Sequence, residues 1–185
     1  MDIISHSAWS FLAAKAINVK KVERPLRPWH VVFWGIAPDL FSFAIFFFWV
    51  IKSIAFGETS PELVPSGTDE PVVDGKYSIS MVTAALYSMS HSIIIFFAIF
   101  VIVLLLRRRP YWEMLGWGLH ILIDVPTHSY HFYPTPVLWP LSEWKFDGIS
   151  WATPWLIIAN YCALIMVIAT IFLERYVIQL RKRKK

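Results

Sequence analysis

The chain has 185 residues, enough for one domain, and we treat residues 1–185 as a single membrane-embedded unit. Hydrophobic residues make up 57% of the chain, against about 45–50% in a soluble protein, and this excess excludes an ordinary soluble domain. The net charge of +4 comes from basic residues that flank apolar runs, so membrane orientation explains it better than nucleic-acid binding does.

In chain order, the first predicted element is a short helix over residues 3–18 at the inner face of the membrane. Four later segments approach the ~20 apolar residues that a helix needs to span a bilayer. The predicted spans are residues 31–51, 81–106, 112–131 and 152–173. The fold class expected from this pattern is an all-α integral membrane protein with four transmembrane helices.

Charge predicts the orientation of these spans. Basic residues gather before the first span, after the second at Arg107–Arg109, and in the tail 174–185, whereas the loop 54–78 is acidic. The positive-inside rule then places both termini and the Arg107–Arg109 turn in the cytoplasm, with the protein in the cell (inner) membrane. The Arg107–Arg109 turn and the tail are then both cytoplasmic, so the chain between them must cross the membrane an even number of times. The span 152–173 is one crossing, and 112–131 must be the other. The loop 132–150, rich in proline and tryptophan, is predicted to cap the bundle at the outer interface.

Two carboxylates, Asp39 and Asp124, lie deep within the predicted spans. A charged group at the bilayer centre costs ~2.5–3.5 kcal/mol on insertion scales, so each needs a partner or a metal. A rise of ~1.5 Å per helical residue places Asp39, His91, His120 and Asp124 at similar depth in three different spans. We therefore expect these four side chains to form one cluster.

The segment "HILIDVPTHS" at 120–129 carries the densest group of polar residues. His120 and Asp124 are separated by four residues and share one helix face. His128 would follow one turn later, but Pro126 can bend or end the helix before it. Imidazole and carboxylate groups are good ligands for zinc and related ions. His30 and His131 lie near the predicted interfaces, where we expect hydrogen-bonded structural roles.

Several motifs occur in an order that resembles a known family. They are "SHS" at 5–7, "GIAPDL" at 35–40, "SHS" at 90–92, "HILIDVPTHS" at 120–129 and "LWPLS" at 138–142. The pattern is similar to that of the predicted membrane-bound metal-dependent hydrolases, which are distantly similar to zinc-dependent phospholipase C. In this chain Leu40 and Phe41 follow Asp39, where family members often carry a second acid.

The resemblance implies a set of metal ligands, residue by residue. The matching positions are His6, Asp39, His91, His120, Asp124 and His128. The implied cofactor is a divalent metal, with zinc expected and manganese as the alternative. Asp39 would act as a ligand or as the catalytic base that orients an attacking water.

The leading functional hypothesis is metal-dependent hydrolysis of a phosphoester or lipid-like substrate in the lipid bilayer. Three alternatives stay open. A transporter would also place Asp and His in its spans, a haem protein could use His91 and His120 as axial ligands, and a closed metal site could be structural. No nucleic-acid partner is expected, and the sequence leaves the oligomeric state open.

Overall fold

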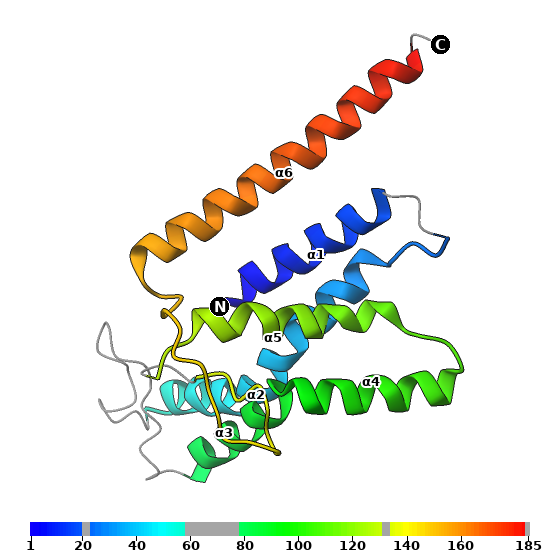
Figure 1. Cartoon of the computed structure of the whole chain (residues 1–185). Coiled ribbons are helices and arrows are strands. Elements are labelled where there is room, and N and C mark those ends of the chain that lie inside the picture. Colours follow the sequence, from blue (N-terminus) through cyan, green and yellow to red (C-terminus); the bar gives the residue numbers. More distant parts are fainter. Residues whose placement is uncertain (20–22, 58–77, 131–133, 184–185) are drawn as a thin grey trace.

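The computed structural model describes residues 1–19, 23–57, 78–130 and 134–183, and every regular element within them is helical. The helices are α1 (Ile3–Val19), α2 (Pro28–Ala55), α3 (Ser78–Ser90), α4 (Ile93–Arg107), η2 (Trp112–Met114), α5 (Leu115–Thr127) and α6 (Pro154–Arg183). Helix α2 packs against α1, α3 and α5, and α6 packs against α1 (Figure 1). The predicted N-terminal helix is confirmed as α1.

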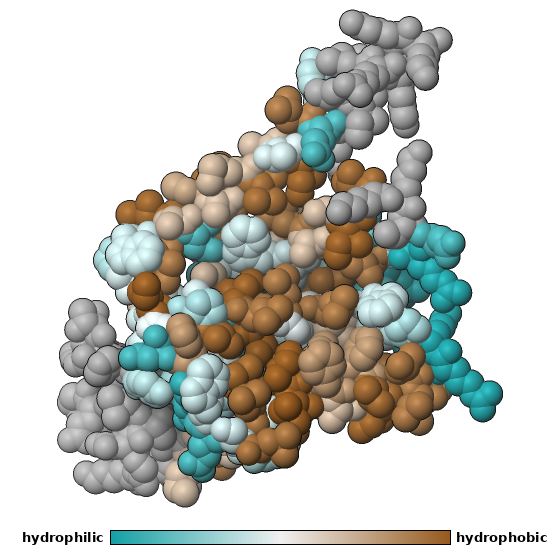
Figure 2. Space-filling view, in the orientation of Figure 1, coloured by the Kyte–Doolittle hydropathy of each residue, from teal (hydrophilic) through white to brown (hydrophobic). Residues whose placement is uncertain are grey.

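Two of the predicted spans are confirmed as single helices. Pro28–Trp49 within α2 and Pro154–Glu174 within α6 are long and apolar enough to cross a membrane. Large apolar side chains on both are exposed, with Phe48 72% and Phe172 69% accessible. Figure 2 shows the apolar surface that such residues make over much of one face of the molecule. This is the surface that a lipid-facing helix presents.

Among the described residues, fewer than the four predicted spans are found. The segment 81–106 divides into two helices, Met81–Ser90 and Ile93–Arg107, bent by 60°. The first helix ends at Ser90, and Ser92 starts the second, since its hydroxyl accepts hydrogen bonds from Ile94 N (3.1 Å) and Ile95 N (3.3 Å), as an N-cap does. The described residues therefore contain two candidate spans, or three if the bent pair counts as one.

Helix α5 is too short for the fourth span. It has 13 residues and ends at Thr127, directly after Pro126, and His128 has an extended backbone. Proline supplies no N–H to the helix, and the chain instead turns into a connection that runs beside α5. Gly148 N, Ile149 N and Trp151 N donate to the carbonyls of His128, Pro126 and Thr127 at 2.8, 3.0 and 2.9 Å. These bonds satisfy carbonyls that the end of a helix leaves free.

Two glycines allow the central helices to approach closely. A Cβ atom at Gly116 of α5 would lie 2.2 Å from the carbonyl oxygen of Val31 in α2. A Cβ at Gly35 of α2 would lie 2.0 Å from the hydroxyl of Ser10 in α1. The three helices thus meet along glycine contacts, and the polar residues of the cluster lie on their facing sides.

Candidate metal centre

Four segments bring the polar residues together. His6 comes from α1, Asp39 from α2, His91 from the break between α3 and α4, and His120 and Asp124 from α5. All of these except Asp39 are 1% exposed or less. The sequence predicted that Asp39, His91, His120 and Asp124 would meet, and each of them offers a ligand atom within 4.8 Å of the others'.

The Asp124 carboxylate lies at the middle of the cluster. Its Oδ2 is 3.1 Å from His120 Nε2 and 3.4 Å from His91 Nε2, and its Oδ1 is 3.0 Å from His6 Nε2. The amino group of Met1 lies 2.5 Å from Oδ1. Three histidines from three segments therefore surround one buried carboxylate.

Asp39 is the second carboxylate next to the two central histidines. Its Oδ1 is 3.5 Å from His91 Nε2 and 3.6 Å from His120 Nε2. Its side chain is 17% exposed, whereas that of Asp124 is fully buried. Asp39 is therefore the member of this four-residue group that reaches accessible space.

His128 lies at the edge of the cluster. Its Nδ1 is 3.6 Å from Asp124 Oδ1 and 3.2 Å from the Asp124 carbonyl oxygen. The extended backbone at His128 turns the chain out of the helix here, but the ring stays buried beside Asp124. The structure therefore places all six residues of the predicted ligand set in one region.

The ring orientation of His120 is defined by a backbone contact. His120 Nδ1 lies 2.7 Å from the carbonyl oxygen of Gly35, and a carbonyl only accepts hydrogen bonds. Nδ1 therefore carries the proton. In the neutral ring, Nε2 then carries a free lone pair. This atom faces Asp39, Asp124 and His91.

A chain of hydroxyls defines the ring of His91 in the same way. Ser42 Oγ donates to the Pro38 carbonyl at 2.8 Å and lies 2.7 Å from Ser90 Oγ, which also donates to the Tyr87 carbonyl at 3.3 Å. Ser90 Oγ then accepts from His91 Nδ1 at 2.9 Å. The proton of a neutral His91 ring is thus on Nδ1, and its Nε2 is a second free lone pair.

These two lone pairs face each other. His91 Nε2 and His120 Nε2 are 2.9 Å apart, and both lie near the carboxylate oxygens of Asp39 and Asp124. Electron pairs in that arrangement repel unless a proton or a metal cation lies among them. Metal-bound histidines commonly donate their other ring N–H to a carbonyl or a similar acceptor, which is the arrangement of both rings here.

The buried polar atoms left without hydrogen bonds support a cation. Among the described residues, four buried side-chain atoms have no hydrogen-bond partner, and three of them are His6 Nδ1, His6 Nε2 and Asp124 Oδ2. Burial lowers the pKa of His6 to about 4, so its imidazole is neutral, the form that binds metals. The nitrogen and carboxylate donors suit zinc, manganese and related divalent ions. The residues present therefore fit a metal site.

The cluster opens into an apolar cavity of about 320 Å³. Asp39 and His128 line it together with aromatic residues of α2, α3 and the connection to α6. These aromatic residues are Phe43, Phe46, Phe47, Tyr87 and Trp151. A ligand that reaches Asp39 through this cavity would contact mainly apolar surface.

His30 lies apart from the cluster. His30 Nδ1 is 2.7 Å from the hydroxyl of Tyr111, in line with the structural role expected for it. His131 lies outside the described residues. The sequence did not indicate Gly35, Ser42 or Ser90 as partners of the histidines, although "SHS" at 90–92 places a hydroxyl next to His91.

Comparison of the chain with protein-family models, with curated proteins and with solved structures found no match. The resemblance to membrane-bound metal-dependent hydrolases thus stays an expectation from the motifs. The function is argued below from the site itself.

Proposed function

We propose that the protein is a membrane-bound metal-dependent hydrolase that acts on a phosphoester or lipid-like substrate. The observation that carries this proposal is the convergence of two imidazole nitrogens, His91 Nε2 and His120 Nε2, on the carboxylates of Asp39 and Asp124. A purely structural histidine–aspartate contact would not need a second carboxylate at the same point.

His91, His120 and Asp124 would hold the cation, and His6 would complete the set from α1. The hydrogen bonds of Nδ1 to Gly35 and Ser90 keep the two central rings oriented. A bound divalent cation would supply Lewis acidity and an ionisable water at neutral pH. His128, at the edge of the cluster, would support Asp124 or bind a second ion.

Asp39 is the residue that we assign to proton transfer. It is the carboxylate that both adjoins the central histidines and lines the cavity. A general base must lie within hydrogen-bond reach of the proton that it takes, and Asp39 meets this condition for a water placed between the cavity and the histidines.

The cavity supports a lipid-like substrate class. Its aromatic walls would accept an acyl or prenyl chain with little cost in polar desolvation, while the ester end points to Asp39. The haem alternative is not favoured, because two Nε2 atoms 2.9 Å apart leave no space for a porphyrin between them.

The test is hydrolysis by the purified chain, supplied with zinc or manganese in neutral detergent. Substrates would be an aromatic phosphodiester and a short-chain phospholipid. We expect activity that a chelator removes, and a fall of at least about 100-fold in Asp39→Asn, since general base catalysis contributes that much. Asp147→Asn is the control, because Asp147 binds Tyr130 N on the connection to α6. Metal-loaded protein without activity on either substrate would contradict the proposal.

A further inference from the structure

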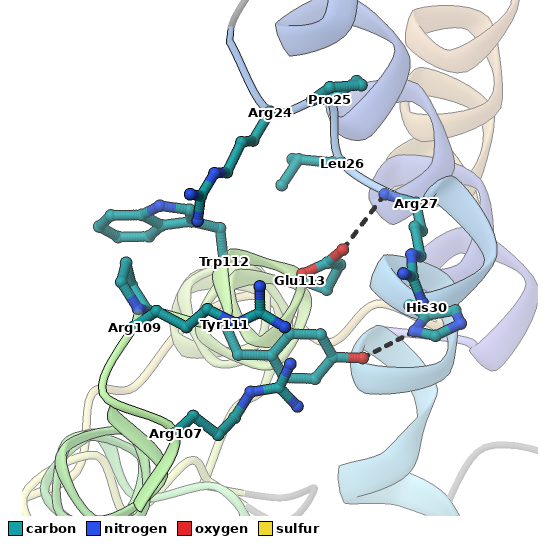
Figure 3. Close-up of a pocket in the computed structure, with 11 residues that line it drawn as sticks. Arg24, Pro25, Leu26, Arg27, His30, Arg107, Arg109, Tyr111, Trp112 and Glu113 are labelled. Carbon is teal, nitrogen blue, oxygen red and sulfur yellow. Dashed lines mark hydrogen bonds between the residues drawn. The ribbon is translucent and has the colours of Figure 1, made fainter. Parts of the chain in front are cut away.

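A second cavity lies beside the N-terminal ends of α2 and α5. It has a volume of about 280 Å³ and lies between the connection that precedes α2 and the turn that precedes α5. Four arginines line it, namely Arg24, Arg27, Arg107 and Arg109. Figure 3 shows these side chains entering from both connections, with Tyr111 and Trp112 between them. We call this site the basic pocket.

The walls of the basic pocket are held together by contacts between the two connections. Tyr111 Oη lies 2.7 Å from His30 Nδ1, and Glu113 Oε1 accepts from the backbone N–H of Arg27 at 3.4 Å. The Arg107 guanidinium lies over the Tyr111 ring, 4.6 Å from its centroid. These contacts position the arginines without using up most of their N–H donors.

The chain makes a strained turn that brings Arg107 and Arg109 to the same pocket. Arg108, between them, has a φ of 54° and forms the left-handed C-cap of α4. This conformation is costly for a residue other than glycine. The turn reverses the chain after α4, and both neighbours of Arg108 line the basic pocket.

Charge in the basic pocket is strongly unbalanced. Four guanidinium groups face one lining carboxylate, that of Glu113. In the part of the chain that the structure describes, no side-chain nitrogen of the four arginines lies within 4.0 Å of a carboxylate oxygen. None of the four therefore forms an ion pair there. An anionic ligand would supply the missing charge.

The chemistry of the pocket selects a phosphate group. The planar guanidinium fork matches two phosphate oxygens, and such bonds are stronger than neutral ones. The pocket also lies where α2 begins and α4 ends, which is the level at which the apolar runs of these helices end. Basic clusters and aromatic rings at that depth are typical of anionic headgroup recognition.

We propose that the basic pocket binds the phosphate of an anionic phospholipid headgroup from the adjoining leaflet. The site is separate from the metal centre, since His30 and Asp39 are nine residues apart on α2, or about 14 Å at the helical rise. The proposal therefore does not depend on hydrolysis.

The test uses the full chain in neutral detergent and follows its thermal unfolding. Phosphatidylglycerol, phosphatidylcholine and inorganic phosphate are added separately at equal concentrations. We expect phosphatidylglycerol to raise the midpoint by at least about 3 °C, in a saturable manner, with little effect of the other two. An equal rise with inorganic phosphate would overturn the lipid assignment, and no rise with phosphatidylglycerol would overturn the site.

Two variants separate a site from diffuse attraction. Arg107→Gln/Arg109→Gln should remove at least half of the rise. The control Lys15→Gln/Lys52→Gln removes the same charge outside the pocket and should keep the rise. If the arginine and lysine double variants lost the rise in midpoint equally, the lipid would be attracted by charge without a site, and the proposal would be overturned. Arg107→Lys/Arg109→Lys keeps the charge and the fold but lacks the guanidinium fork, so it should also weaken the response, and a full response there would contradict phosphate recognition in the pocket.

Discussion

At the scale of single residues, the candidate metal centre depends on groups outside the proposed ligand set. The Ser90 hydroxyl lies between His91 Nδ1 and the Ser42 hydroxyl, at 2.9 and 2.7 Å. Its proton is directed to Ser42 or to the Tyr87 carbonyl at 3.3 Å, so it accepts from His91. Removing this acceptor would leave His91 Nδ1 with the Tyr87 carbonyl, 3.2 Å away, as its acceptor, and the Nε2 lone pair would be held less firmly toward Asp124.

We therefore predict that Ser90→Ala weakens metal affinity by about 10–100-fold, the usual effect of losing a partner that orients a ligand. Competition with a chelator of known affinity would measure the change. Ser7→Ala is the matched control, because the Ser7 hydroxyl binds the Ile3 carbonyl on the exposed side of α1. Unchanged affinity in Ser90→Ala would show that the hydroxyl chain does not orient His91.

The candidate ligands could be predicted from the sequence because of where they occur. A carboxylate such as Asp39 or Asp124 in an apolar run is costly, and helical rise alone sets its depth. The partners Gly35 and Ser42 could not be found in this way. Their roles depend on the rotation of α2 relative to α3 and α5, and glycine or serine within an apolar helix has no cost that would draw attention to it.

At the scale of the elements, the approach of α5 to α2 depends on Gly116. A Cβ atom there would lie 2.2 Å from the backbone oxygen of Val31 and 3.1 Å from Gly35 N. Backbone atoms cannot move aside as a flexible side chain can. Alanine would gain about 0.5–1 kcal/mol over glycine from helix propensity, but separating two packed helices costs more.

We expect Gly116→Ala to lower the free energy of unfolding by about 1–3 kcal/mol and to reduce metal content, since α2 and α5 both carry ligands. Gly118→Ala is the comparison, because its Cβ would meet only the Phe96 ring, at 3.3 Å, and should be nearly neutral. Unfolding in mixed micelles would measure both variants. A stability of Gly116→Ala equal to that of Gly118→Ala would contradict the close contact.

Element ends were harder to predict than element type. The apolar lengths of α2 and α6 predicted both helices. The break at Ser92 and the end of α5 after Pro126 depend on bonds to distant residues. Ile93 N donates to the Val137 carbonyl at 2.9 Å, and the connection to α6 occupies the last carbonyls of α5. A hydropathy pattern contains no information on such contacts. It therefore could not show that two of the four expected spans are broken or shortened.

At the scale of the whole molecule, the C-terminal ends of several helices lie on one side. Figure 1 shows the C-terminal ends of α1, α4 and α6 toward the right of the view, and the N-terminus and the start of α6 toward the left or centre. Arg107 and Arg109 belong to the first side. The charge pattern predicts a cytoplasmic face there, and residues 58–77 of the acidic loop 54–78, on which the prediction also rests, lie outside the described residues.

Topology can be tested by labelling cysteines in intact cells. In a Cys162→Ser background, Ser66→Cys in the acidic loop should react with an impermeant maleimide without permeabilisation. Arg109→Cys should react only after the cells are permeabilised. The reason is that basic segments are retained in the cytoplasm. Labelling of Ser66→Cys only after permeabilisation would show the opposite orientation.

The central claim is that the histidines and aspartates form a metal site joining four segments of the chain. His120 and Asp124 contribute the most contacts within it, to His91, His6 and Asp39. Without a cation, the neutral rings of His91 and His120 would leave their lone pairs unpaired beside carboxylates. A protonated histidine is the rival explanation, and it predicts no bound metal.

Elemental analysis of the purified chain, after supply of zinc or manganese and removal of free ions, tests this claim most directly. We predict about one divalent ion or more per parent chain. The metal content should fall at least about tenfold in His120→Ala and in Asp124→Asn, because each change removes a ligand and disturbs the site geometry. His30→Ala, which alters a histidine outside the cluster, should keep the parent's content. A parent that stays empty, or His120→Ala and Asp124→Asn variants that keep the parent's metal, would contradict the account.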